Sequence, residues 1–131
     1  MLNISHYKII AIGKIKKKWI QEGIEMYLKR LPGLEIIEIK DNNQTKEEHM
    51  IKGIISKNEI LVTLNEDGES FTSKQLATKL LNSYNQNIIF VIGGASGLSS
   101  SLNNSASWQL SLSPLTFPHE IARLLLIEQL Y

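Results

Sequence analysis

Short apolar runs alternate along this chain with longer amphipathic stretches, and the two patterns have different periods. Five apolar runs are bounded by polar or glycine residues, as strands are: 7–13, 34–39, 60–64, 88–92 and 109–112. Between them, apolar side chains recur every three or four positions over 19–31, 50–55 and 76–84, which predicts amphipathic helices. Strands that alternate with helices predict an α/β fold, with a mostly parallel sheet and helices on both faces.

Local signals set the expected boundaries of these elements. The second run alternates apolar and acidic residues, which predicts a strand with one solvated face near an edge of the sheet. The polar run 65–69 predicts a loop after the third strand. Two helices are expected to begin with a capping box, formed by Thr45 with Glu48 and by Thr72 with Gln75.

A last helix is predicted after the fifth strand, with Pro118 at its first position and Glu120 in its first turn. Its apolar residues wrap almost the whole circumference, whereas a surface helix shows a single apolar stripe. A domain of this size has little material to bury a helix on all sides, so we expect a homodimer built on this helix. The alternative is a central helix buried within one chain.

Two loops near the end of the chain are candidates for ligand binding, because ligands of open α/β sheets bind where strands end. The first, Gly93-Gly94-Ala95-Ser96-Gly97, allows a ligand to approach the backbone closely, although a structural turn explains it about as well. Its spacing fits neither the dinucleotide fingerprint, nor a P-loop, nor a nucleophile elbow.

The second loop spans 113–118 and contains two prolines among small or apolar residues. Such a loop can wrap a flat heterocycle, with peptide groups on its edge and apolar side chains on its face. It carries no charge for a phosphate, so adenosine suits it better than a phosphorylated nucleotide. A buried linker is the alternative interpretation.

Composition narrows the chemistry further. The chain has 131 residues and no cysteine, so we expect a single domain over 1–131 without disulfides, thiol nucleophiles or cysteine-bound metals. No apolar run reaches 18 residues and no signal peptide is evident, which favours a cytoplasmic protein. Of three histidines, only His119 lies beside a candidate loop, and no spacing of histidine and carboxylate residues predicts a metal site.

The charge is unevenly distributed, although the net charge is only +1. Residues 1–30 carry seven basic and two acidic side chains, with four lysines concentrated at Lys14, Lys16, Lys17 and Lys18. A basic end on a nearly neutral protein indicates a partner that bears phosphates. A solvated lysine loop is the alternative.

One combination of motifs is specific. A strand leads into Gly-Gly-x-x-Gly, Ser-Leu-Ser-x-Leu-Thr-Phe-Pro-His follows, and an apolar helix ends in Glu-Gln-Leu-Tyr. Together with the opening strand and the Trp19 helix, this resembles the ribosomal RNA large subunit methyltransferase H family of the SPOUT superfamily. The resemblance covers essentially the whole chain.

The resemblance implies an α/β fold with a deep trefoil knot in the C-terminal half, and a homodimer. It implies methyl transfer from S-adenosylmethionine to nitrogen 3 of a pseudouridine in 23S ribosomal RNA, presented as RNA or as the assembled ribosome. The residues implied to contact the cofactor are Leu64, Gly93, Leu112, Ser113, Pro114, Leu115, Thr116 and Phe117. We expect Lys14, Lys16, Lys17, Lys18 and Arg123 to contact RNA and His119 to assist in proton handling.

Members of that family continue past the position of Tyr131 with a tail thought to reach the active site. The cofactor pocket is therefore expected to be complete and the substrate side incomplete. An alternative function follows, namely a knotted protein that binds S-adenosylmethionine or RNA with impaired catalysis.

Overall fold

The computed structural model describes residues 4–83, 86–94, 97–113, 115 and 117–131. Five strands form one sheet: β1 (Tyr7–Ile12), β2 (Glu35–Ile39), β3 (Glu59–Ser70), β4 (Asn87–Ile92) and β5 (Trp108–Ser111). They lie in the order β2-β1-β4-β3-β5, and every neighbouring pair is parallel. The predicted α/β class and the parallel sheet are confirmed.

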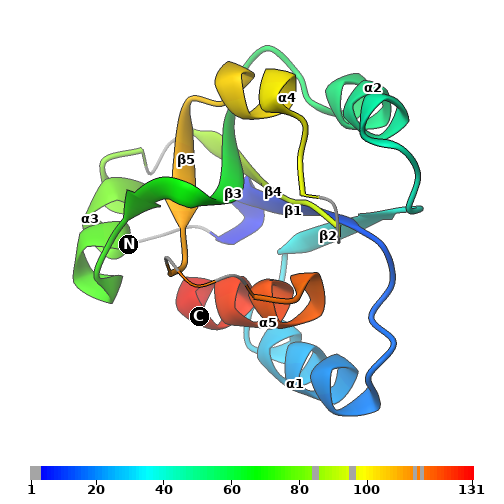
Figure 1. Ribbon diagram of the computed structural model, residues 1–131. Coiled ribbons are helices and arrows are strands. Elements are labelled where there is room, and N and C mark those ends of the chain that lie inside the picture. Colours follow the sequence, from blue (N-terminus) through cyan, green and yellow to red (C-terminus); the bar gives the residue numbers. More distant parts are fainter. Residues whose placement is uncertain (1–3, 84–85, 95–96, 114, 116) are drawn as a thin grey trace.

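Five α-helices and a short 3₁₀ turn, η1 (Ile4–His6), accompany the sheet. The helices are α1 (Lys18–Lys29), α2 (Gln44–Ile54), α3 (Ser73–Leu81), α4 (Ser100–Ser105) and α5 (His119–Leu130). Figure 1 shows α1 and α5 side by side below the sheet, whereas α2 and α4 lie above it. Helices on both faces are therefore confirmed.

The inner strands explain why the sheet needs cover on both faces. Along β1, Tyr7, Ile9 and Ala11 belong to the core shared with α1, α3 and α5. Ile10 and Ile12 point into the second core, under α2 and α4. Side chains alternate between faces of a strand, so a run without polar residues buries apolar surface on both faces.

The strand β2 lies at an edge of the sheet as predicted, but the single solvated face expected for it is wrong. It pairs with β1 alone, so it forms an edge of the sheet. Glu35 and Glu38 are exposed, whereas Ile39 is buried against the core under α2. Ile36 packs on the core shared with α1 and α5, whereas Ile37 and Ile39 pack on the core under α2, so both faces of β2 are partly covered.

The expected loop at 65–69 is wrong, because β3 continues to Ser70. β5 pairs first with Val62–Leu64 and then, after a register shift, with Glu69 and Ser70. Gly68 makes this continuation possible: a Cβ there would lie 2.7 Å from the Gln109 carbonyl oxygen. A glycine within a strand can therefore mark close backbone approach as well as a turn.

Helix starts show which capping signals were correct. The box at Thr72 and Gln75 forms as predicted, with both reciprocal hydrogen bonds. The Thr45 box is wrong, because the cap of α2 is Asn43, whose side chain accepts from the Lys46 N–H. The short helix α4, capped by Ser99, has no apolar stripe long enough to predict it.

The last helix begins at His119, with Pro118 in the capping position instead of the first helical position. Within the single chain it already buries Leu126, Ile127 and Leu130. Its apolar circumference is thus partly explained by packing on the chain's own core. The homodimer and the trefoil knot both stay predictions.

Two glycines offer a matched test of this packing. Gly68→Ala should lower the free energy of unfolding by about 1–3 kcal/mol, because the methyl group meets the β5 backbone. Gly53→Ala should raise it by about 0.4–1 kcal/mol, since no atom lies within 4 Å in that helix. Urea denaturation measures both. Equal effects at the two positions would contradict the close β3–β5 approach.

Candidate functional site

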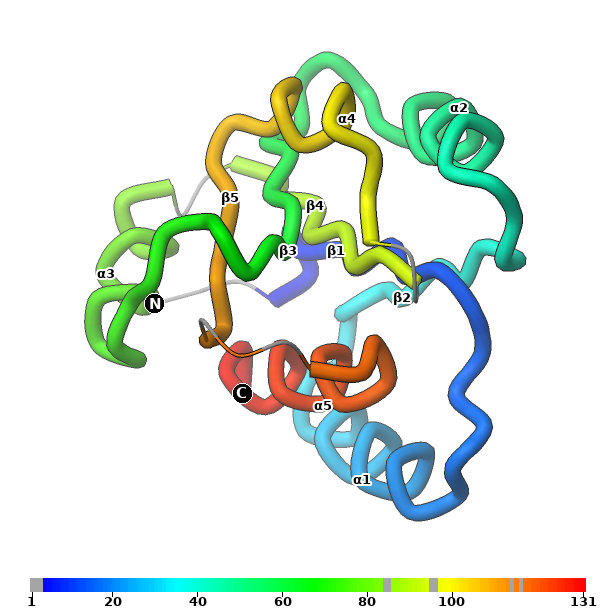
Figure 2. The backbone as a smooth tube through the Cα atoms, in the orientation of Figure 1, coloured from blue at the N-terminus to red at the C-terminus, as the bar shows by residue number. Residues whose placement is uncertain are grey.

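A cavity of about 710 Å³ opens where β3, β4 and β5 come together beside α5. Its wall includes Leu64 of β3, Gly93 after β4, and Leu112 after β5. In Figure 2 the end of β5 lies beside α5 at this edge of the sheet. Segments distant in sequence therefore meet around one space because their strands are parallel neighbours.

The chemical character of this cavity is mostly apolar. Five leucines, one isoleucine, a phenylalanine and three glycines make most of its described wall. Among the described residues that line it, Glu66 is the one carboxylate, His119 the one imidazole, and no lysine or arginine occurs. Such a wall suits a flat, uncharged ring system and offers no cation for a phosphate.

Hydrogen bonds shape the start of the loop that follows β5. The Ser111 hydroxyl lies 3.1 Å from the Glu66 carbonyl oxygen and 3.0 Å from that of Ser113. The Ser113 hydroxyl accepts from the Leu115 N–H at 3.1 Å. These hydrogen bonds fix the backbone where it leaves the buried strand. A loop whose backbone is fixed in this way can present its peptide groups to a ligand.

Gly93 is constrained by its own chain. A Cβ at this position would lie 2.8 Å from the carbonyl carbon of Gly97 and 3.0 Å from the Leu98 nitrogen. The loop therefore folds back on the end of β4 so tightly that only glycine fits. A side chain at position 93 would therefore clash with the loop of its own chain before it could meet a ligand.

His119 stands at the wall of the cavity, at the first position of α5. Its Nδ1 is buried and has no hydrogen-bond partner among the described residues. Its Cε1 lies 3.4 Å from where a Cβ of Gly13 would be, so the ring packs on the end of β1. The ring is held in place by packing, and one of its nitrogens is not bound within the described chain.

Two carboxyl groups lie behind the glycine loop. The Asp41 side chain places its Oδ1 3.0 Å from the position of a Gly94 Cβ, and its Oδ2 3.7 Å from that of Gly13. Beside it, Glu47 is buried and accepts the Asn42 N–H at 2.9 Å. Burial raises the pKa of the Glu47 carboxyl, and its hydrogen bond with Asp41 raises it further, whereas the Asn42 N–H opposes the shift.

The structure brings most of the residues expected to contact the cofactor around this one cavity. Those among the described residues are Leu64, Gly93, Leu112, Ser113, Leu115 and Phe117. Pro114 and Thr116 lie outside the described residues. The spatial convergence is observed, and binding of S-adenosylmethionine by these residues stays a prediction.

The lysine segment, residues 14–18, connects β1 to α1 and is held by the start of α5. Glu120 Oε1 accepts the backbone N–H of Lys16 at 2.7 Å and that of Lys17 at 3.1 Å. These two bonds, that from Lys17 first, lower the pKa of the Glu120 carboxyl, and the nearby His119 also lowers it. Ile15 is buried, so the segment is anchored while its four lysines stay exposed.

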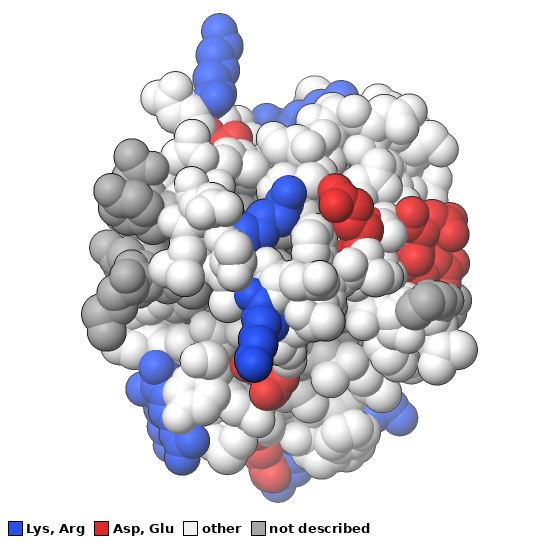
Figure 3. Space-filling view, turned by 90° about the vertical axis from the view of Figure 1, so that its left-hand side faces the viewer, with Lys and Arg blue, Asp and Glu red and all other residues white. Residues whose placement is uncertain are grey.

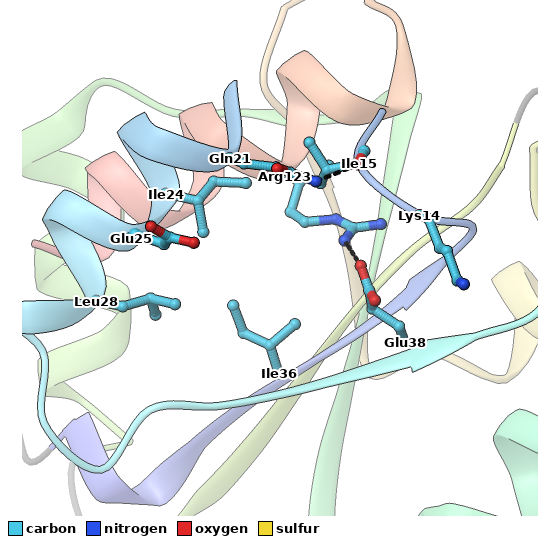
Figure 4. Close-up of a pocket in the computed structure, with 9 residues that line it drawn as sticks. All are labelled: Lys14, Ile15, Gln21, Ile24, Glu25, Leu28, Ile36, Glu38 and Arg123. Atoms are coloured by element: carbon cyan, nitrogen blue, oxygen red, sulfur yellow. Dashed lines mark hydrogen bonds and ion pairs between the residues drawn. The ribbon is translucent and has the colours of Figure 1, made fainter. Parts of the chain in front are cut away.

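Arg123 lies apart from the other residues expected to contact RNA. It is buried, forms an ion pair with Glu38 at 2.5 Å, and donates to the Gly13 carbonyl oxygen at 2.8 Å. Figure 4 shows it beside a second cavity, of about 390 Å³, between α1 and β2. Contact with RNA would require the guanidinium to leave these partners.

The charge on the face that carries α3 can be compared with that of the lysine segment. Figure 3 views the side of the molecule that carries α3, where basic side chains stand apart and acidic ones gather at one margin. A phosphate backbone needs a continuous basic path. This face is therefore less suited to RNA than the lysine segment.

Sequence reasoning missed the second layer around the glycine loop. Two residues of the β2–α2 region contact that loop: Asp41 packs on Gly94, and Gln44 donates to the Gly97 carbonyl at 3.5 Å. Glu48 accepts from the hydroxyl of Ser99, the cap of α4, just after the loop. No motif signals this arrangement, because it depends on which strands become neighbours.

Comparison with known proteins identifies the class. A family model described as "Predicted SPOUT methyltransferase" matches residues 5–131. Among solved structures, the SpoU methyltransferase AviRb from Streptomyces viridochromogenes, in complex with AdoMet, matches 93% of this chain and 55% of that chain. The TM-score between the two is 0.49, at 11% sequence identity.

Curated relatives are much closer in sequence. The ribosomal RNA large subunit methyltransferase H of Prochlorococcus marinus NATL2A is 90% identical over all 131 residues, which cover 90% of that protein. Proteins of the same name are 56% identical in strain MIT 9211 and 52% identical in Parasynechococcus marenigrum WH8102, again with 90% of the relative covered. The chain belongs to the ribosomal RNA large subunit methyltransferase H family, and the resemblance deduced from its motifs is confirmed.

The described residues contain neither a candidate metal-binding group nor a candidate membrane-spanning helix. No group of three or more histidine, aspartate or glutamate side chains is placed there to hold a metal ion. None of the helices in that part of the chain is long and apolar enough to cross a membrane.

The carboxyl pair behind the glycine loop predicts a pH effect on stability. An unfolded glutamate titrates near about pH 4.3. Because the folded-state pKa of Glu47 is raised, its contribution to stability is present below the unfolded pKa and lost as pH rises through the folded pKa. Glu47→Gln should therefore gain stability relative to the wild type as pH rises from roughly 4 to 7.

Glu48→Gln is the matched control in the adjacent position. Ser99 and Lys52 lower the pKa of Glu48, so its contribution is present above the unfolded pKa and lost as pH falls. The Glu48→Gln deficit should thus shrink toward acid pH, opposite in sign to the Glu47 effect. Urea denaturation across this range measures both variants, and parallel pH profiles would contradict the assignment.

Proposed function

We propose that this chain transfers a methyl group from S-adenosylmethionine to large-subunit ribosomal RNA, at nitrogen 3 of a pseudouridine, in the cytoplasm. The observation that supports this most is the convergence of the two candidate loops on one apolar cavity in a member of the methyltransferase H family. Family membership favours this activity over the alternative of binding without turnover.

The residues of the cavity fit an adenosyl group. Gly93 and Ser113 line the cavity, and we propose that their backbone groups bind the edge of the ring. Leu64 and Phe117 offer apolar contact for its faces. The absence of lysine and arginine from the described wall agrees with a nucleoside that bears no phosphate. When bound, S-adenosylmethionine supplies a methyl group on a sulfonium centre, which is already activated for transfer.

Direct attack by the ring nitrogen leaves two tasks for the protein. It must align that nitrogen with the methyl group, and it must let the imide proton leave. The sequence contains no cysteine, so a thiol adduct to the base is excluded. His119 is the candidate for proton handling, because its Nδ1 is unpartnered among the described residues at the cavity wall.

Lys14, Lys16, Lys17 and Lys18 are proposed to contact RNA phosphates. All four are exposed, and they follow one another on a connection that is anchored at both ends. We retain Arg123 as a candidate nearer the target base, although its ion pair with Glu38 competes with that role. Charge-dependent binding of this kind weakens as salt rises.

A homodimer built on α5 completes the proposal. Leu125 is half-buried and is not packed with the described core of its own chain, unlike its neighbours Leu124 and Leu126. It therefore has apolar surface available for a second copy. Residues such as Leu126 and Ile127 are fully buried within one chain, so changing them would test folding instead of assembly.

The function is tested by transfer of labelled methyl groups to ribosomes that lack the modification. The wild-type chain should label large-subunit RNA. Phe117→Ala should weaken cofactor affinity about tenfold in calorimetric titration, a loss of roughly 1.4 kcal/mol, because apolar contact with the ring is removed. Gly93→Ala should weaken it at least as much by deforming the loop. Full cofactor binding without transfer would support the binding-only alternative.

The dimer is tested by sedimentation at micromolar concentration. The wild type should sediment as a dimer, and Leu125→Glu should shift it to monomer by placing a charge in a dry interface. Met50→Glu, an exposed apolar position on α2 at the other face of the sheet, is the control and should leave the dimer intact. A monomeric wild type would contradict the proposal.

A further inference from the structure

The position of Glu120 is unexpected for a protein that binds RNA. Its carboxylate lies against the lysine segment, where a free negative charge would repel phosphates. Both lysine residues that it touches are held through their backbone N–H groups and not through their ammonium groups. None of the ion pairs described in the structure involves Lys14, Lys16, Lys17 or Lys18. The carboxylate is thus engaged by the backbone while the four ammonium groups stay available.

The lysine segment has no other fixation of this kind at its centre. Near its start, Ile15 is buried and its carbonyl oxygen accepts from the Gln21 side chain at 2.7 Å, a contact visible in Figure 4. After it, α1 begins, but the residue in its capping position, Lys17, has no side-chain cap. Glu120 therefore acts as a cap supplied from another helix, and an acidic group is favourable at a helix start.

The location of Glu120 links the two proposed sites. It lies in the first turn of α5, three residues after Phe117 in the cavity wall and next to His119. The hydrogen bonds to Lys16 and Lys17 span 104 and 103 residues of sequence. The lysine segment is consequently held to the same helix end that closes the proposed cofactor cavity.

We propose that Glu120 is a positioning residue for RNA binding, which fixes the lysine segment relative to the cofactor cavity by holding the Lys16 and Lys17 backbone. The inference rests on the proposed function and deepens it, because it assigns the segment's orientation to one carboxylate. The RNA phosphates are then bound at a fixed distance from the methyl donor, as alignment of the reacting atoms requires.

Removal of the Glu120 side chain should change RNA affinity in the direction opposite to the one expected from its charge alone. Removing a negative charge beside four lysines should by charge alone strengthen RNA binding. Glu120→Ala should instead weaken it, by about tenfold, and should flatten its dependence on salt by about 0.7–0.9 log units per lost phosphate contact. Glu120→Gln keeps an acceptor oxygen for the backbone N–H groups and should recover most of the affinity.

Glu22→Ala is the matched control. Glu22 is exposed on α1, close in sequence to the same lysines, and its removal changes the charge by the same amount. It should leave RNA affinity unchanged or slightly stronger. Cofactor affinity, measured by calorimetry, should stay within about twofold of the wild type in all three variants, which separates positioning from general unfolding.

Measurements use the full chain with a large-subunit RNA fragment over a range of salt concentrations, and a variant with all four lysines neutralised is included. If the four-lysine variant binds RNA as the wild type does, the proposed RNA surface is wrong. If that variant loses binding while Glu120→Ala behaves like Glu22→Ala, the surface is correct and the role of Glu120 is refuted. Loss of cofactor affinity in Glu120→Ala would also refute it, because a fold defect would explain the result.

Discussion

The position of β4 between β1 and β3 is the constraint on which the rest of the structure depends. Each of these strands is parallel to the next, so all of them deliver their following loops to the same edge of the sheet. Every side chain from Ile88 to Ile92 is buried, which leaves no freedom to shift register without exposing apolar surface. The cavity, the glycine loop and the start of α5 all lie where this alignment places them.

Carboxylates hold the segments at that edge together. Asp41 packs against the glycine loop, Glu48 accepts from the Ser99 hydroxyl just after that loop, and Glu120 holds the lysine segment. Glu48 also forms an ion pair with Lys52 at 3.0 Å, whereas the hydrogen bonds that Glu120 accepts come from backbone N–H groups. The four lysines of the lysine segment take part in none of the ion pairs that the structure describes, and no cation lines the described wall of the apolar cavity.

The sequence predicted the parts of this arrangement that have a period or a motif. Strands at 7–13 and 88–92, the Thr72 box and the edge position of β2 followed from local patterns. The loop residues expected to bind a cofactor also converge, because strand ends determine where they lie. The continuation of β3 past Leu64 was not predicted, because the polar residues 65–69 look like a loop in sequence.

Other features could not be predicted because they depend on contacts across the sheet. The Asp41–Glu47 pair and the capture of Lys16 and Lys17 by Glu120 join elements with no shared motif. The burial of Arg123 also could not be predicted. A basic residue on the last helix suggested a free positive charge, but its guanidinium pairs with Glu38 on the edge strand β2. Local periodicity contains no information about such partners.

The long sequence separations of these contacts have a consequence for biosynthesis. Arg123 reaches the end of β1 across 110 residues, and Glu120 reaches the lysine segment across more than 100. During translation the first strand and the lysine segment emerge long before the helix that holds them. Until α5 has been made and has docked, the basic segment lacks its anchor. The proposed RNA-binding surface therefore takes its final shape only after α5 has docked.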